Sequence, residues 1–211
     1  FGQGALRSHP YVLTEMRAAM DSDDRRGGIE FDQTLIAHVR WAMSNVMRAL
    51  WYGLTRARTA PAPRQDPAMA TAYRQLTRMS TAFALSADMA MLTLGGSLKR
   101  RERLSARLGD ALSYLYLGSA ALKRFRDDGQ PDADRALVEW VWRESVYRIQ
   151  ESLLAFCDNF PIRLVGYLLK HWIFPFGRSY RPPSDRLRDD LAAIIMRPGQ
   201  SRDRLTAGLY I

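Results

Sequence analysis

The stretch LGGSLKRRERLSARLGDALSYLYLGSAALKRF, residues 94–125, decides the fold. Beyond its charged beginning, apolar side chains recur at three- and four-residue spacing, the period of an amphipathic α-helix. The predicted core face consists of Leu104, Leu108, Ala111, Leu112, Leu115 and Leu122. Gly95 and Gly96 end the preceding helix, because glycine adopts a left-handed cap without a Cβ clash. Two long helices joined by so short a turn must lie side by side and antiparallel.

Long helical patterns separated by short turns also fill the rest of the chain. The long ones are predicted at 31–54, 67–94, 98–126 and 132–158, and shorter ones at 10–21, 161–174 and 184–196. No segment alternates with a period of two for long enough to be a strand. We therefore predict an all-α fold, an antiparallel bundle of about four long helices plus shorter C-terminal helices.

Helix boundaries and one core face can also be predicted. Asp66, Asp132 and Ser184 are expected to cap helices, and DSDDRRGG, 21–28, is expected to be a polar turn. In the helix 31–54, the predicted core stripe consists of Phe31, Leu35, Val39, Ala42, Val46 and Leu50. The boundaries follow from capping preferences, and the core stripe follows from the 3.6-residue helical period.

Composition limits the class of protein. The 211 residues are 47% hydrophobic and 25% charged, which is typical of a soluble globular protein and excludes wholesale disorder. The single cysteine, Cys157, excludes an internal disulfide and a cysteine-based zinc site, and indicates a reducing compartment. The longest apolar run, 164–174, is too short to span a membrane, so we expect a cytoplasmic protein. Both chain ends are expected to continue into further polypeptide.

A net charge of +9 requires that an anionic partner be considered. The densest cations are Lys99, Arg100, Arg101, Arg103 and Arg107, but helical geometry divides them between faces, so we expect no nucleic-acid partner. Arg101 falls within the leucine arc, where an unpaired guanidinium would be costly. Asp88 is the only charged residue between Arg78 and Lys99, so we predict a structural ion pair of Asp88 with Arg101 or Arg107 across the glycine hairpin.

No self-contained catalytic or metal site is predicted. FGQGALR, 1–7, has two glycines of a dinucleotide fingerprint but lacks the third glycine and the preceding strand. His9, His38 and His171 lie far apart and form no metal-ligand spacing. We therefore expect no catalytic residue and no metal ligand, and we can assign no cofactor-binding residue.

Aromatic residues away from the main apolar stripes suggest docking. Trp41, Trp51 and Tyr52 project from the polar side of the helix 31–54, and Trp140 and Tyr147 form a second stripe on 132–158. Exposed aromatics at such spacings are typical of a contact with another domain or subunit. The alternative is a second core layer within the bundle.

A membrane contact is the second open question. In residues 166–181, Lys170, Trp172, Phe174, Phe176 and Arg178 mix aromatic and basic side chains in the manner of a lipid headgroup interface. The alternative, which we favour, is a helix packed under the bundle and closed by a Pro-Gly turn.

Three stretches together resemble a known family. FGQGALRSHPYVLTEM (1–16), the stretch 94–125 and FPFGRSYRPPSDRL (174–187) look like the C-terminal region of bacterial FadE-type acyl-CoA dehydrogenases. The resemblance covers essentially the whole chain. It implies a flavoenzyme of fatty-acid β-oxidation that uses FAD to convert an acyl-CoA to the trans-2-enoyl-CoA.

The resemblance also implies where the chemistry lies. The family's catalytic glutamate belongs to a Glu-Gly segment, and no Glu-Gly occurs in these 211 residues, so this chain alone is expected to be inactive and to bind no FAD. Residues 1–22 would be the tail of the catalytic region and 23–211 a C-terminal helical domain. Its partners would be the upstream catalytic domain, acyl-CoA through that domain, a second copy in a homodimer, and a peripheral contact with the inner face of the cell membrane. The alternative is a free-standing basic helical module that binds an anionic membrane surface or nucleic acid.

Overall fold

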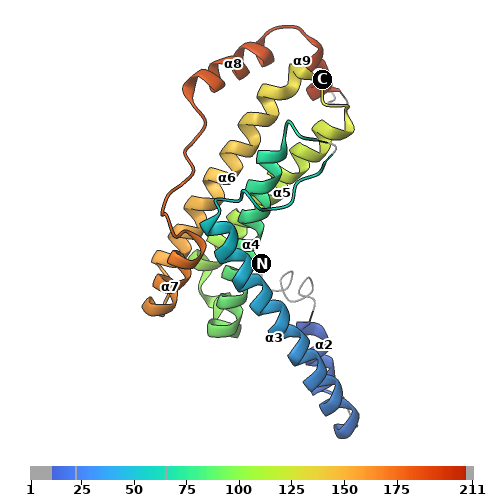
Figure 1. The fold of residues 1–211 in the computed structure, drawn as a ribbon, viewed down its shortest axis with the longest axis vertical. Helices are drawn as coiled ribbons and strands as arrows, with labels where there is room; N and C mark the ends of the chain where they lie inside the picture. The colour runs from blue at the N-terminus through green and yellow to red at the C-terminus, as the bar shows by residue number, and fades with distance from the viewer. Residues whose placement is uncertain (1–10, 22, 65, 208–211) are drawn as a thin grey trace.

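The computed structural model describes residues 11–21, 23–64 and 66–207, and within them it contains eight α-helices, two 3-10 helices and no strand. The elements are α2 (Val12–Ala19), α3 (Asp24–Leu54), α4 (Ala70–Leu94), η1 (Gly95–Arg100), α5 (Glu102–Asp127), η2 (Asp132–Asp134), α6 (Arg135–Asp158), α7 (Arg163–Ile173), α8 (Asp185–Met196) and α9 (Gln200–Thr206). The predicted all-α bundle is confirmed (Figure 1).

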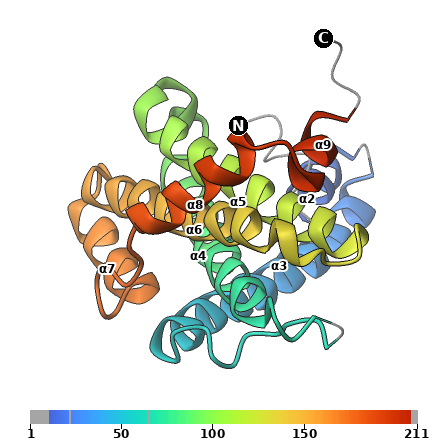
Figure 2. The same ribbon diagram turned by 90° about the horizontal axis from the view of Figure 1, so that it is seen from above.

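The core lies where α4, α5 and α6 meet. Helices α5 and α6 run side by side along most of their length, and α4 packs across both of them (Figure 2). Met79, Leu108, Ile149 and Phe156 are completely buried there. The predicted face of α5 is confirmed except at Leu112, which is 46% exposed. Leu112 lies at the edge of the leucine arc, about 80° around the helix axis from Leu104, and therefore turns toward solvent.

Helix α3 is longer than predicted. It begins at Asp24 because Asp23 accepts hydrogen bonds from the backbone N–H groups of Arg25 and Arg26, each at 3.2 Å. The expected polar turn over 21–28 is therefore wrong, since its second half is helical. Helix α2 packs alongside, and together α2 and the first turns of α3 extend away from the other helices (Figure 1).

The end of α4 at Gly95 is as predicted, whereas the start of the next α-helix is not. Gly95 ends α4 with a φ of +48°, a conformation that L-residues with a side chain rarely adopt. Residues 95–100 form a 3-10 helix, and α5 begins only at Glu102 rather than at residue 98. Arg101 is the cap residue between them, with φ −103° and ψ 64°. The α-helical period consequently does not extend back to Arg101.

The capping predictions have mixed outcomes. Ser184 caps α8 as expected, its Oγ accepting from the Leu187 N–H at 3.3 Å. Asp66 accepts from the Met69 N–H at 3.1 Å, but this bond closes a turn that precedes α4. Asp132 begins a 3-10 helix instead of α6. Helix α9 was not predicted, and Arg204 attaches it to Asp134 through two bonds of 2.9 and 3.0 Å.

One stretch of the described residues, 70–100, is long and apolar enough to cross a membrane, with a mean hydropathy of 1.2. In the structure, α4 instead packs against α3, α5 and α6. A helix at the centre of a soluble domain has the same composition, so this property is weak evidence for a membrane span.

Candidate functional site

The predicted ion pair of Asp88 is wrong. Asp88 Oδ2 accepts a hydrogen bond from Asn45 Nδ2 of α3 at 3.5 Å, and no ion pair among described residues joins Asp88 to Arg101 or Arg107. Burial raises the pKa of the Asp88 carboxyl, and the Asn45 hydrogen bond partly offsets that rise. The prediction failed because Arg101 was assigned a helical direction, whereas it lies exposed in the non-helical cap before α5.

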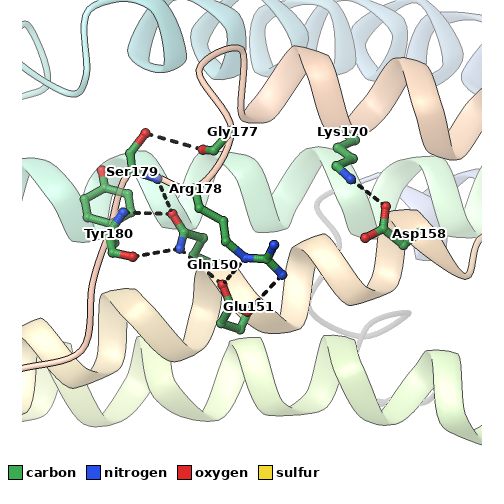
Figure 3. A network of polar contacts seen from close by, with 8 residues as sticks. All are labelled: Gln150, Glu151, Asp158, Lys170, Gly177, Arg178, Ser179 and Tyr180. Carbon is green, nitrogen blue, oxygen red and sulfur yellow. Dashed lines mark hydrogen bonds and ion pairs between the residues drawn. The ribbon is translucent and has the colours of Figure 1, made fainter.

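The segment 174–181 lies against α6 and is held there by Gln150, whose side chain is completely buried (Figure 3). Gln150 Oε1 accepts from the backbone N–H groups of Ser179 and Tyr180, at 2.8 and 2.9 Å. Its Nε2 donates to the Tyr180 carbonyl at 3.0 Å. We call these three bonds the Gln150 latch. One side chain thus provides the hydrogen bonds that a neighbouring backbone segment would supply in regular structure.

Arg78 of α4 holds the same segment from the other side. It is only 2% exposed, and it donates to the Tyr180 hydroxyl at 2.8 Å and to the Ile173 carbonyl at 3.3 Å. Its guanidinium lies over the rings of Phe174 and Tyr180, with centroids at 5.7 and 5.3 Å. Burial raises the pKa of the Tyr180 phenol, and the neighbouring guanidinium partly counteracts that rise. Sequence reasoning missed Arg78, because its partners lie about a hundred residues away in sequence.

These contacts change the interpretation of the residues that were predicted to contact a membrane. Phe174 is 2% exposed, so its prediction as a membrane contact is wrong. Lys170 pairs with Asp158 at 2.7 Å and Arg178 with Glu151 at 3.0 Å (Figure 3).

The two remaining aromatic residues of that set stay at the surface. Trp172 donates from its indole N–H to the Val46 carbonyl at 2.9 Å, and Phe176 is exposed beneath the guanidinium of Arg56. A membrane contact through these surface residues stays a prediction.

The five aromatic residues predicted to dock differ in exposure. Trp51 is more than half exposed, whereas Trp41 and Tyr52 on the same helix are half-buried. On α6, Trp140 and Tyr147 are also half-buried, and the Trp140 indole N–H is buried without a hydrogen-bond partner among the described residues. A docking role for these residues stays a prediction.

A different row of α3 side chains forms an exposed apolar surface on this helix. Its members recur at four- and seven-residue spacing and are each between 47% and 57% exposed: Ile29, Ile36, Met43, Met47 and Leu54. We call this row the α3 stripe. The predicted core stripe is wrong in part, because Leu35 and Val39 are also exposed while Asn45 and Ala49 are buried. The small side chain of Ala49 allows α3 to lie close to its neighbours.

Two cavities flank α3. The first, of about 490 Å³, is lined by Trp41, Asn45, Arg48, Tyr73, Leu76, Thr77, Ser80, Thr81, Ala84, Leu115, Ser119 and Leu122. These residues lie inside α3, α4 and α5, so their backbone N–H groups are committed to helical bonds. The second, of about 670 Å³, has a mainly apolar lining in which Lys99 is the only lysine or arginine among described residues.

The described part of the chain contains no group of three His, Cys, Asp or Glu side chains that could hold a metal. Burial raises the pKa of the Cys157 thiol from 9.0 to about 12. Cys157 therefore stays protonated near neutral pH and is not a nucleophile.

Cys157 should be unreactive in the folded domain. Its thiolate fraction at about pH 8 should be roughly a thousandfold below that of an ordinary thiol, because each pKa unit changes it about tenfold. Mass spectrometry should therefore show iodoacetamide alkylation that is at least about a hundredfold slower than in guanidinium chloride. Because the folded pKa is raised, this thiol should also lower stability as pH rises from about 9 to about 12. Equal alkylation rates with and without denaturant would contradict this assignment.

The sequence model of one protein family, described as acyl-CoA dehydrogenase, C-terminal, bacterial type, matches residues 6–211. The chain belongs to this family. No solved structure matches the chain. The resemblance to the C-terminal region of FadE-type enzymes is confirmed, and the alternative of a free-standing binding module is not favoured.

Membership in this family of oxidoreductase domains implies a partner catalytic domain in the full acyl-CoA dehydrogenase, and FAD in that enzyme. The described residues do not fit a flavin dinucleotide. Its pyrophosphate needs free backbone N–H groups or several cations, whereas the smaller cavity is lined by residues inside helices and the larger by apolar side chains. No flavin contact is therefore assigned to these residues.

Proposed function

We propose that this domain docks onto the catalytic region of an FAD-dependent acyl-CoA dehydrogenase of fatty-acid oxidation. The full enzyme would oxidise an acyl-CoA to the trans-2-enoyl-CoA, with the catalytic glutamate and the flavin outside this chain. The single observation that carries the docking role is the α3 stripe, because it is a continuous apolar row without a covering element among the described residues.

The dimensions of the α3 stripe support an interface with another folded domain. From Ile29 to Leu54 it extends about 38 Å along α3, at 1.5 Å per residue. Single exposed apolar residues are normal on protein surfaces, whereas a contiguous patch of this kind marks a contact. The protrusion of α2 and the start of α3 from the bundle supports the same role, because it would let a catalytic domain reach both sides of the helix (Figure 1).

Charged side chains in the α3 stripe should disrupt the enzyme. We expect the double variant Ile36→Glu/Met47→Glu of the full dehydrogenase to lose at least about tenfold in kcat/KM, since burying unpaired carboxylates in an interface costs several kcal/mol. The native mass should fall or the domain should become protease-sensitive. Light scattering and acyl-CoA-dependent reduction of an electron acceptor measure these effects.

The matched control places the same charges on α8. Ile195 and Met196 are adjacent and more than half exposed, so Ile195→Glu/Met196→Glu should leave mass and turnover close to wild type. Wild-type mass and turnover in the α3 stripe variant would refute docking through this surface.

A further inference from the structure

The larger cavity is a groove between α3 and the α4–η1 hairpin. Its lining consists of Leu35, His38, Val39, Ala42, Met43, Val46, Leu85, Asp88, Met89, Met91, Leu92, Gly95, Gly96, Leu98, Lys99 and Ser105. We call it the α3–α4 groove. Its volume of about 670 Å³ lies within the roughly 300–1,000 Å³ of ordinary ligand sites, which are mostly apolar with a few polar groups.

The shape and lining of this groove suit a single acyl chain. From Leu35 to Val46 it follows α3 for about 16 Å, close to the length of an extended myristoyl chain. Three of its lining residues are methionines, whose flexible thioether side chains adapt to ligands of varied shape. A rigid aromatic ligand would find no aromatic ring to stack on other than the imidazole of His38 among the described lining residues.

The basic side chains near the groove lie at its hairpin end. Lys99 lies at the hairpin end, because η1 follows the last residue of α4 directly. Its ammonium forms no ion pair with a described residue, and the neighbouring Arg100 and Arg101 are exposed cations. The lining acid, Asp88, lies on α4 within hydrogen-bonding distance of Asn45. An anionic head group is therefore attracted to the hairpin end.

We propose that the α3–α4 groove binds one saturated acyl chain whose anionic head group lies against Lys99. The head group is the single carboxylate of a free fatty acid, because one lysine suits one carboxylate, whereas the several phosphates of an acyl-CoA need more cations than this lining offers. Met43 belongs both to the α3 stripe and to the lining of the groove, whereas Ile36 and Met47 belong to the stripe alone. A stripe variant at Ile36 and Met47 therefore leaves the groove residues unchanged. No reaction takes place there, since the site only holds the chain.

Photocrosslinking to the full dehydrogenase tests the site directly. A palmitate analogue with a diazirine near its methyl end is irradiated with the protein, and adducts are mapped by mass spectrometry. We expect adducts on the two walls, residues 35–46 and 85–92. Unlabelled palmitate and palmitoyl-CoA are added separately as competitors, and we expect palmitate to compete more strongly. Stronger competition by palmitoyl-CoA would overturn the assignment of a carboxylate head group.

Two pairs of variants test whether the acyl chain occupies the groove and whether its head group contacts Lys99. Ala42→Trp fills the groove and should reduce adducts at 85–92 at least about tenfold, because it removes the space that the chain occupies. The same substitution at exposed Ala120 of α5 should leave them unchanged. Lys99→Glu should weaken palmitate binding by about tenfold, the loss of one charge-assisted contact, whereas Arg100→Glu changes the same charge outside the lining and should have less than about a threefold effect.

Three further results would also overturn the proposal. Adducts spread over the exposed surface and unaffected by Ala42→Trp would show adventitious labelling. Equal weakening of palmitate binding by Lys99→Glu and Arg100→Glu would show that the net positive charge of this region attracts the ligand, without a specific contact to Lys99. Labelling only from a photoactivatable phosphatidylglycerol in vesicles would indicate a membrane contact instead of a bound chain. Because the α3 stripe variant is scored by mass and turnover, docking and acyl-chain binding can fail separately.

Discussion

Gly166→Ala should destabilise the domain by about 3 kcal/mol or more, the upper part of the range for overpacking a core. An added Cβ would overlap the carbonyl oxygen of Cys157 and lie 2.9 Å from the Cβ of Phe160. A backbone oxygen cannot rotate away as a flexible side chain can, so α7 would have to move off α6. Urea unfolding at 25 °C, monitored by circular dichroism, measures the change.

Gly109→Ala is the matched control for this prediction. Gly109 lies inside α5, and a Cβ added there would meet nothing within 4 Å. Alanine is preferred over glycine within helices by roughly 0.5–1 kcal/mol, so this variant should be more stable than wild type. The two substitutions should therefore have opposite signs, and a stable Gly166→Ala domain would show that α7 does not pack as described.

Gln150→Leu should cost about 2–4 kcal/mol, because it removes the Gln150 latch while keeping a side chain of similar size. The N–H groups of Ser179 and Tyr180 would lose their acceptor, and the Tyr180 carbonyl would lose its donor. A buried polar group left without a partner is more costly than the net value of the bond it made. Segment 174–181 should also become accessible to protease.

The control and the readouts separate the latch from a general loss of stability. Gln33→Leu lies on the exposed surface of α3 and should change the free energy of unfolding by less than about 0.5 kcal/mol. Thermal unfolding gives the stability, and limited proteolysis gives the position of the first cleavage. First cleavage outside 174–184, with wild-type stability, would contradict the role assigned to Gln150.

Much of the local structure could be predicted from residue types. The end of α4 at Gly95, the cap at Ser184 and the buried leucines of α5 follow from backbone sterics and helical period, which act within a few residues. The family was also recognisable, because long stretches of sequence carried the resemblance. The 3-10 helix at 95–100 broke this reasoning, since the direction of Arg101 was extrapolated through it.

The face that α3 buries could not be predicted from its own residues. Apolar side chains occupy a wide arc of this helix, and the period assigns them to one side without showing which part of that side meets a neighbour. The structure buries Asn45 and Ala49 and leaves Met43 and Met47 exposed, because α4 and α7 pack at an angle set by the whole fold. The candidate docking surface thus appeared only in the structure.

For the segment 174–181 too, the sequence predicted the local structure and the tertiary fold decided the location. Its mixture of aromatic and basic residues is compatible both with a lipid surface and with a segment packed under the bundle, so the sequence alone determined only its composition and its Pro-Gly turn. Its location was decided by Arg78 and Gln150, which lie far away in the chain and come together only after the helices pack. Local sterics determine where helices begin and end, whereas burial and pairing depend on which distant side chains the tertiary fold brings together.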